Sequence, residues 1–306
     1  MKSKAIINLL WSDADIGGAE VYARKVAHLT CGRVISLRGS SLSELLELFT
    51  LLFSRESVFV FHDFRASMFS FARFFYRHDT IIIHGPTTRP KLANALFTIL
   101  SNFVGNVISV NKGMLSLKHV GNIIYLENEA NLPFSCDLAG SDFVYFGRIN
   151  ESKGVRRLCK WWSEQDFSLV LHLIGDGPSL GELSRRYQCK NIRFHGPLSH
   201  EDMRLILEEC CFYISLSERE GLSLALAEAM SVGLIPIVMS IPSQLYLGNE
   251  GFPLIEDEIS LSYLLKDYLS KSNEEIHALR NQVRVLWADR NPGTWTKFWE
   301  EFPTNL

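Results

Sequence analysis

Residues 211–238, CFYISLSEREGLSLALAEAMSVGLIPIV, decide the expected fold. Residues 211–215 have the aromatic and β-branched character of a buried strand, and residues 234–238 repeat it. Between them, Ser223 can cap a helix by accepting a hydrogen bond from one of its first backbone N–H groups. A strand, a helix and a second strand in this order are typical of a parallel sheet covered by helices.

The same alternation of short apolar runs and helical patterns extends through all 306 residues. Strand candidates lie at residues 4–10, 33–37, 57–61, 80–84, 106–110, 122–126, 142–147, 168–174, 191–194, 211–215 and 234–238. We therefore predict an α/β protein with two Rossmann-like, doubly wound parallel-sheet domains. The expected boundaries are 1–135 for the first domain and 136–290 for the second. Residues 291–306 are expected to form a helix that returns to the first domain.

The amino-acid composition argues against several classes of function. The net charge of −3 argues against a nucleic-acid binder, which usually needs a dominant basic surface. Residues 1–140 carry 14 Lys and Arg against 11 Asp and Glu, so this half is the better candidate to meet an anionic partner. The six cysteines show no zinc-like spacing, and no apolar run is long enough to span a membrane. We expect a cytoplasmic protein.

Glu228 is an unusual carboxylate because it lies inside the apolar run that follows Gly221. Burying it would be costly without a hydrogen-bond partner, so its position indicates recognition of a ligand. Glu220 precedes it in a polar turn after a strand. Carboxylates suit ligands rich in hydroxyl groups because they accept several hydrogen bonds. The alternative is that Glu220 is an exposed turn residue and Glu228 a buried structural acceptor.

Two further strand-to-helix turns contain glycine. Gly147 and Arg148 follow the strand at 142–146, and Lys153 comes shortly after, so cations and free backbone N–H groups could bind a diphosphate there. The alternative is a surface loop with solvated charges. Gly175-Asp-Gly-Pro178 follows the strand at 168–174, and such a turn by itself is more often structural.

The first half offers weaker candidates. Gly17 and Gly18 follow the first strand and would let a ligand approach the backbone. His62 and His84 each end a predicted strand at the edge where open α/β sheets bind ligands. A single histidine at a strand end is more often structural, but two at one edge make a functional role as reasonable as a structural one.

These residues together resemble the retaining glycosyltransferases of the GT-B fold, of the glycosyltransferase family 4 type. The resemblance covers about residues 145–240. Its motifs are Gly147-Arg148 with Lys153-Gly154, Gly175-Asp-Gly-Pro178, Phe194-His-Gly196, and a Glu-x7-Glu motif from Glu220 to Glu228.

The resemblance implies a role for each matching residue. Arg148 and Lys153 would bind the donor diphosphate and stabilise the leaving group without a metal, and no cofactor is expected. Glu228 would bind the ribose, Glu220 would lie near the donor sugar, and His84 would be the first-domain histidine near that sugar. The implied catalytic residues are Glu220, His84, Arg148 and Lys153. The implied donor-binding residues are Gly17, Gly18, Arg148, Lys153, Gly175, His195, Glu220, Gly221, Leu222, Ser223, Leu224 and Glu228.

The implied function is transfer of a sugar from a nucleotide-diphosphate sugar to a hydroxyl group, with retention at the anomeric carbon. We expect a UDP-sugar rather than a GDP-sugar, and a glycan or lipid-linked acceptor, with no nucleic acid involved. The family often has Gly-Phe-Gly where this chain has Gly221-Leu-Ser223, a change that could alter donor choice. The alternatives are a GT-B epimerase or phosphorylase, and a non-catalytic partner subunit that binds nucleotide sugars.

Residues 64–78 combine Arg65, Arg73 and Arg77 with five phenylalanines and no carboxylate. They could form an interfacial helix at the inner face of an anionic membrane, where a lipid-linked acceptor would be found. The alternative is a core helix whose arginines lie at its rim.

Overall fold

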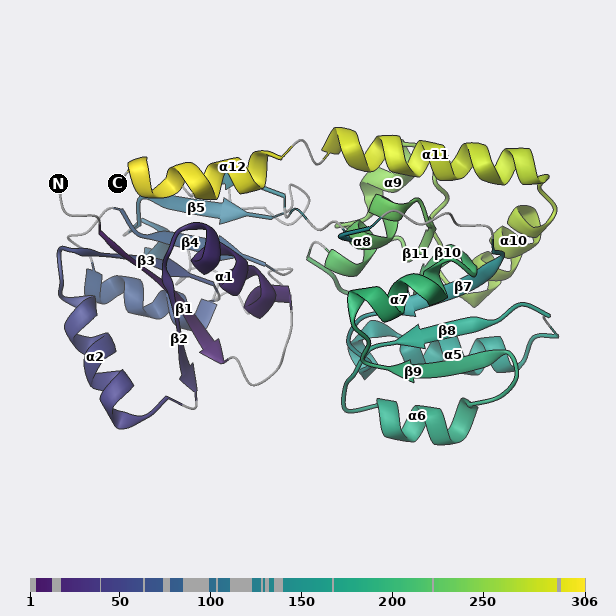
Figure 1. Ribbon diagram of the computed structural model, residues 1–306, viewed down its shortest axis with the longest axis horizontal. Helices are drawn as coiled ribbons and strands as arrows, with labels where there is room; N and C mark the ends of the chain where they lie inside the picture. Colours follow the sequence, from purple (N-terminus) through teal and green to yellow (C-terminus); the bar gives the residue numbers. More distant parts are fainter. Residues whose placement is uncertain are drawn as a thin grey trace. The chain divides into compact units, whose positions relative to one another are not determined.

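The computed structural model describes residues 4–12, 18–38, 40–62, 64–73, 78–84, 99–102, 104–110, 123–127, 129, 132–134, 140–166, 168–221, 223–290 and 293–305. The chain divides into two compact units (Figure 1). The first unit comprises residues 1–129 and 293–306, and the second comprises residues 130–292. The first unit is therefore assembled from two separate segments of the chain, whereas the second is continuous.

The first unit is built on a parallel sheet with the strand order β2-β1-β3-β4-β5-β6. Its strands are β1 (Ala5–Ser12), β2 (Arg33–Arg38), β3 (Ser57–Phe61), β4 (Thr80–Ile83), β5 (Asn106–Ser109) and β6 (Ile123–Tyr125). Its described helices include α1 (Gly18–Leu29), α2 (Leu42–Leu52), α3 (Phe64–Ser67), η1 (Met68–Arg73), α12 (Thr294–Glu301) and η4 (Phe302–Asn305). The central strand β3 is buried along its whole length, as expected where helices cover both faces of a parallel sheet.

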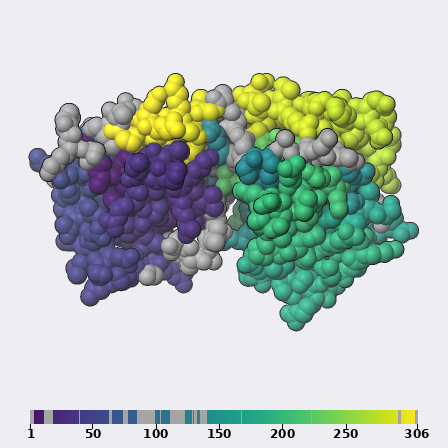
Figure 2. All heavy atoms as spheres, in the orientation of Figure 1, coloured from purple at the N-terminus to yellow at the C-terminus, as the bar shows by residue number. Residues whose placement is uncertain are grey.

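Helix α12 belongs to the first unit because its tryptophans pack against α1. Trp295 and Trp299 are buried, and the indole N–H of Trp299 donates to the hydroxyl of Tyr22 at 3.3 Å. The rings of Tyr22 and Trp295 meet edge to face at 5.1 Å. The yellow atoms of α12 lie directly on the purple atoms of this unit in Figure 2. The last helix therefore completes the core of the first unit.

Arg73 contradicts part of the membrane hypothesis. Its side chain is completely buried, and its Nε donates to Asp79 Oδ2 at 2.6 Å. Its other nitrogens donate to backbone carbonyls, including those of Leu52 and Ser57. An arginine held in this way cannot face a membrane, nor does it lie at the rim of a core helix. Arg65 is exposed, and Arg77 lies outside the described residues.

The second unit is built on a parallel sheet with the order β11-β10-β7-β8-β9. Its strands are β7 (Asp142–Phe146), β8 (Leu171–Ile174), β9 (Ile192–Gly196), β10 (Cys210–Ser215) and β11 (Ile235–Val238). Its helices are η3 (Glu151–Lys153), α5 (Val155–Ser163), α6 (Leu180–Tyr187), α7 (His200–Leu207), α8 (Leu224–Val232), α9 (Leu245–Asn249), α10 (Glu258–Leu269) and α11 (Asn273–Arg290). Alternate residues of β7 enter two separate apolar cores, one on each face of the sheet.

Each predicted strand coincides with an observed one, with small differences at the ends. The largest difference is at residues 168–174, where the strand begins only at Leu171. The backbone N–H of Val170 donates to the carboxylate of Asp142 at 2.9 Å, so regular pairing starts after it. Among the described helices, none combines the length and the hydropathy needed to cross a bilayer.

Candidate functional site

The candidate site of the second unit lies at the carboxyl edge of its sheet. After β7 the chain adds β8 and β9 on one side, and then adds β10 and β11 on the other. The loops that follow β7 and β10 therefore leave the sheet in opposite directions. Such a switch point is where open α/β sheets bind ligands.

Local contacts fix the loop after β7. The hydroxyl of Tyr145 donates to the carbonyl of Arg148 at 2.7 Å, and the side chain of Asn150 accepts from the backbone N–H of Lys153 at 3.2 Å. Gly154 has φ 69°, and a Cβ there would lie 2.2 Å from the carbonyl oxygen of Leu216 in the loop after β10. Only glycine allows the two loops to approach this closely.

The turn after β8 packs against the same loop. Gly175 has φ 134°, and a Cβ there would lie 1.9 Å from the carbonyl oxygen of Gly147. Gly177 has φ 153°, and its Cβ would lie 2.3 Å from the carbonyl oxygen of Ile149. These glycines bring two turns of the sheet edge together, in agreement with the structural interpretation of the Gly-Asp-Gly turn. A donor-binding role for Gly175 stays a prediction.

Replacing Gly175 by alanine is expected to destabilise the second unit by at least about 1–3 kcal/mol, the usual cost of a strained backbone conformation, because the new Cβ would also meet the carbonyl of Gly147. Gly181 is the matched control: it lies in α6 and its Cβ would meet nothing within 4 Å. Gly181→Ala should raise stability by up to about 1 kcal/mol. Urea unfolding of both variants gives the comparison; equal stabilities would contradict it.

Lys153 and Glu220 form an ion pair that joins the two loops of the switch point. The ammonium of Lys153 lies 2.7 Å from Oε1 and 2.6 Å from Oε2 of Glu220. The side chains are 27% and 10% exposed, so the pair is largely shielded from solvent but can still be reached. Two residues separated by 67 positions, and predicted to act on one ligand, are thus in direct contact.

Arg148 adds a second cation on the same loop. Its side chain is half-buried, and its guanidinium makes no hydrogen bond or ion pair with the residues that the structure describes. A half-buried guanidinium without a carboxylate is suited to bind an anion.

Glu228 lies in the second turn of α8 and is half-buried rather than fully buried. Burial raises the pKa of the Tyr213 phenol, and the carboxylates of Glu220 and Glu228 raise it further. The charges of both carboxylates therefore act on the same ring of β10. Ser223 caps α8 as predicted, accepting from the N–H of Leu226 at 3.3 Å. Leu222 lies outside the described residues.

His195 is paired with a second histidine. It lies at the bulge between β8 and β9, with its Nε2 3.0 Å from Nδ1 of His172. Burial lowers the pKa of both imidazoles, which favours their neutral forms. Sequence reasoning missed His172, whose signal was a histidine inside the otherwise apolar strand Leu171–Ile174.

The first unit contains a connected row of polar side chains at its own sheet edge. Nε2 of His62 lies 2.8 Å from Oδ1 of Asn8, and Nδ1 of His62 lies 3.2 Å from Nε2 of His84. Because Asn8 donates its amide to the carbonyl of Arg33, its Oδ1 is left to accept from His62 Nε2–H. His84 must then donate through Nε2–H, which leaves a lone pair on its Nδ1.

This arrangement makes His84 a neutral hydrogen-bond acceptor. Burial lowers the pKa of His84 to about 3, so its ring is uncharged at neutral pH. Sequence reasoning singled out both histidines but missed Asn8, an amide in the middle of a buried apolar strand. Gly18 begins α1, and Gly17 lies outside the described residues.

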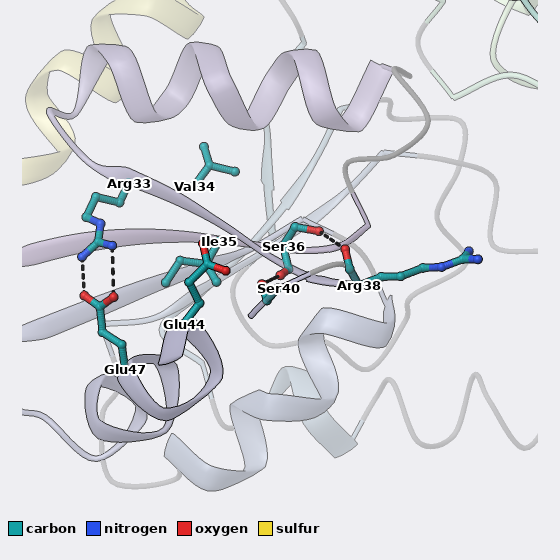
Figure 3. Close-up of a pocket in the computed structure, with 8 residues that line it drawn as sticks. All are labelled: Arg33, Val34, Ile35, Ser36, Arg38, Ser40, Glu44 and Glu47. Atoms are coloured by element: carbon teal, nitrogen blue, oxygen red, sulfur yellow. Dashed lines mark hydrogen bonds and ion pairs between the residues drawn. The ribbon is translucent and has the colours of Figure 1, made fainter. Parts of the chain in front are cut away.

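A pocket of about 190 Å³ lies elsewhere in the first unit. Figure 3 shows its position between β2 and α2, beside the ion pair of Arg33 and Glu47. Its lining residues are Arg33, Val34, Ile35, Ser36, Arg38, Ser40, Glu44 and Glu47. None of them belongs to the predicted site.

Comparison with known proteins shows a family similarity for most of the second unit. Residues 140–267 match the family model for glycosyl transferases group 1. This match supports a glycosyltransferase. The matched region includes the loops after β7, β8 and β10 that carry the candidate site.

A curated relative is the GDP-mannose:cellobiosyl-diphosphopolyprenol alpha-mannosyltransferase of Xanthomonas oryzae pv. oryzae. It is 30% identical over 120 residues, which are 36% of this chain and 32% of the relative. The chain thus covers about a third of that protein.

Two solved structures match nearly the whole chain. HepE of Anabaena, in complex with UDP and glucose, has a TM-score of 0.75 at 15% identity and covers 99% of this chain and 100% of its own. Sucrose-phosphate synthase of Thermosynechococcus elongatus has a TM-score of 0.76 at 14% identity, with the same coverage. The predicted fold class, two parallel-sheet units of the GT-B type, is confirmed.

Proposed function

We propose that this protein is a retaining glycosyltransferase that moves a sugar from a nucleotide-diphosphate sugar to a hydroxyl group. The observation that carries the proposal is the ion pair of Lys153 and Glu220 across the switch point of the second sheet. It places a cation suited to a diphosphate in contact with a carboxylate suited to sugar hydroxyls. Arg148 supplies a second cation on the same loop.

The pair gives a physical account of donor binding. In this structure the carboxylate of Glu220 neutralises Lys153. When a diphosphate approaches, the ammonium can turn toward it, and Glu220 then becomes free to accept hydrogen bonds from the donor sugar. Lys153 and Arg148 would stabilise the charge that develops on the leaving diphosphate, with no metal in that role. Glu228, near Tyr213, would accept from the ribose hydroxyls.

The proposal does not specify the base of the donor nucleotide. The solved structure of HepE holds UDP and glucose, whereas the curated Xanthomonas relative is named for GDP-mannose. The expectation of UDP over GDP is therefore a prediction without support from these relatives. An acceptor linked to a polyprenol diphosphate, as in the name of the Xanthomonas enzyme, is one example of the lipid-linked class we propose.

A binding screen with UDP-, GDP- and ADP-sugars, each with and without EDTA, tests the donor site. Glu228→Ala should weaken binding of the preferred donor by roughly 10–100-fold, the effect of losing hydrogen bonds to a charged group. Glu201→Ala, which removes an exposed carboxylate from α7, is the control and should bind like the parent. Absence of binding to any nucleotide sugar, or normal binding by Glu228→Ala, would show the assignment to be wrong.

Product analysis tests the reaction itself. We expect transfer to an added acceptor, with the anomeric configuration of the donor kept in the product, measured by NMR of the anomeric proton. Conversion of the sugar nucleotide without an acceptor would identify an epimerase instead. Binding without any turnover would identify a non-catalytic subunit.

We also propose that the first unit contacts an anionic membrane, through α2 rather than through residues 64–78 as a whole. Leu42, Leu46 and Phe49 are 75%, 61% and 63% exposed, and Phe53, which follows the helix, is 55% exposed. Their spacing places them on one side of α2. Exposed apolar groups of this size indicate an interaction surface, and Arg55 is exposed and can meet lipid phosphates, although the exposed Glu44 and Glu56 lie in the same segment.

Changing Leu46 and Phe49 together to serine should reduce binding to vesicles of phosphatidylglycerol and phosphatidylcholine by at least about 10-fold, because each apolar side chain contributes roughly 1.5–3 kcal/mol on burial. Vesicle flotation measures the effect. Leu205→Ser is the control, since this residue of α7 is 67% exposed but lies in the second unit. Unchanged flotation of the double variant would rule out α2 as the contact.

A further inference from the structure

Three potential metal ligands meet at the amino edge of the second sheet, the edge opposite to the candidate donor site. Asp142 is the first residue of β7, His172 lies in β8, and Glu209 directly precedes β10. Nε2 of His172 is 3.4 Å from Oδ2 of Asp142 and 3.9 Å from Oε2 of Glu209. The three ligand atoms all lie within 4.8 Å of one another.

Contacts outside this group hold two of the ligands in place. Oδ1 of Asp142 accepts from the backbone N–H of Val170 at 2.9 Å, which leaves Oδ2 facing His172. Nδ1 of His172 lies 3.0 Å from Nε2 of His195, which leaves its Nε2 facing the carboxylates. Metal-binding histidines usually have such a partner on their second nitrogen.

The local charge also favours a cation. Two carboxylates converge here on one imidazole nitrogen, Nε2 of His172. Within the part of the chain that the structure describes, neither Asp142 nor Glu209 has an ion pair with lysine or arginine. The group therefore carries two carboxylates, and Arg193, the guanidinium whose charge acts on His172, forms no ion pair with either of them.

We propose that Asp142, His172 and Glu209 bind a divalent cation, with Zn²⁺ as the best fit. Tetrahedral zinc with bonds of about 2.0–2.1 Å to nitrogen and oxygen keeps its ligand atoms ~3.4 Å apart. The separation of Asp142 and His172 already has this value. Glu209 is 60% exposed, so it can move the short distance needed. Water would occupy the fourth position, and the ion would tie together the beginnings of β7, β8 and β10.

Binding would also fix the protons of the two histidines. Without the ion, His172 donates from Nε2 to Asp142 and accepts at Nδ1 from His195 Nε2–H. With the ion on Nε2 of His172, its proton must sit on Nδ1 and be donated to His195 Nε2. The proton of His195 then moves to its own Nδ1. The cation thus changes His195 from an acceptor to a donor at Nδ1.

Calorimetric titration of the full chain with Zn²⁺ tests the site. We expect one equivalent to bind, and Glu209→Gln to weaken that binding at least 10-fold without unfolding the protein, because Glu209 is exposed. Asp142→Asn should weaken it as well. Glu208→Gln is the matched control, since this neighbouring carboxylate is paired with Arg204 at 3.0 Å and is not one of the three ligands.

Two further measurements separate this site from binding to the free cysteines. Co²⁺ in place of Zn²⁺ should give a spectrum without thiolate-to-metal charge-transfer bands. Nitrogen-15 NMR of the imidazoles should show His195 changing tautomer when the ion is added. The proposal is overturned if no Zn²⁺ binds, if Glu209→Gln and Asp142→Asn bind it like the parent, or if the cobalt spectrum shows thiolate ligands.

Discussion

Replacing Lys153 by alanine is expected to lower the rate of sugar transfer by roughly 10²–10³-fold, the usual loss when one stabilising group is removed from a developing negative charge. The ammonium of Lys153 lies 2.6 Å from Oε2 of Glu220 in the second unit. Its loss would leave the leaving diphosphate with one cation instead of two. It would also leave Glu220 without its partner, so the loop after β10 would lose one of its links to the loop after β7.

Steady-state kinetics with the donor found in the binding screen measures this effect. Lys160→Ala is the control, because Lys160 is an exposed lysine on the neighbouring helix α5. The control should keep the rate of the parent, and thermal unfolding should show that both variants are folded. If the Lys153→Ala enzyme kept a rate within twofold of the parent, the assignment of Lys153 to the catalytic site would be wrong.

Arg73→Met should lower the free energy of unfolding by about 3–5 kcal/mol, because breaking a buried ion pair leaves its other member uncompensated. The pair of Arg73 and Asp79 is completely buried at 2.6 Å. Burial already raises the pKa of Asp79, and loss of the guanidinium would raise it further. The variant would also leave the carbonyls of Leu52 and Ser57 without their donor.

Urea unfolding followed by circular dichroism measures this change. Arg65→Met is the control, because Arg65 is exposed in the same segment, and its substitution should change stability by less than about 0.5 kcal/mol. An Arg73→Met protein as stable as this control would contradict the role of the buried pair. Recovery of part of the loss in Arg73→Met/Asp79→Asn would support it, since the second change removes the uncompensated charge.

The strands could be predicted because each is a short apolar run bounded by glycine, proline or polar residues. Residues 57–61 are an example: every side chain there is buried, and the run is too short for a helix. The cap at Ser223 could also be predicted, since capping depends only on residues three positions apart. Strands and helix caps depend mainly on residues that are neighbours in the sequence, so the sequence alone can predict them.

Contacts between distant residues could not be predicted in the same way. The sequence assigned separate roles to Lys153 and Glu220, but nothing in it measures the distance between residues 67 positions apart. The buried position of Arg73 could not be predicted for a related reason. An arginine among phenylalanines resembles a membrane-facing helix until its partner, Asp79, and the carbonyls around it are placed in space. Asn8 and Glu209 were missed because each acts only through neighbours from other strands.

The position of α12 has a consequence for the order in which the protein is made. The second unit is one continuous segment, so it can fold as soon as residues 130–292 have left the ribosome. Tyr22 is synthesised long before its packing partners Trp295 and Trp299, because 277 positions separate it from Trp299. Synthesis of the first unit therefore starts before that of the second unit and is completed after it. Until then the side of α1 that carries Tyr22 lacks the tryptophans that cover it in the folded unit.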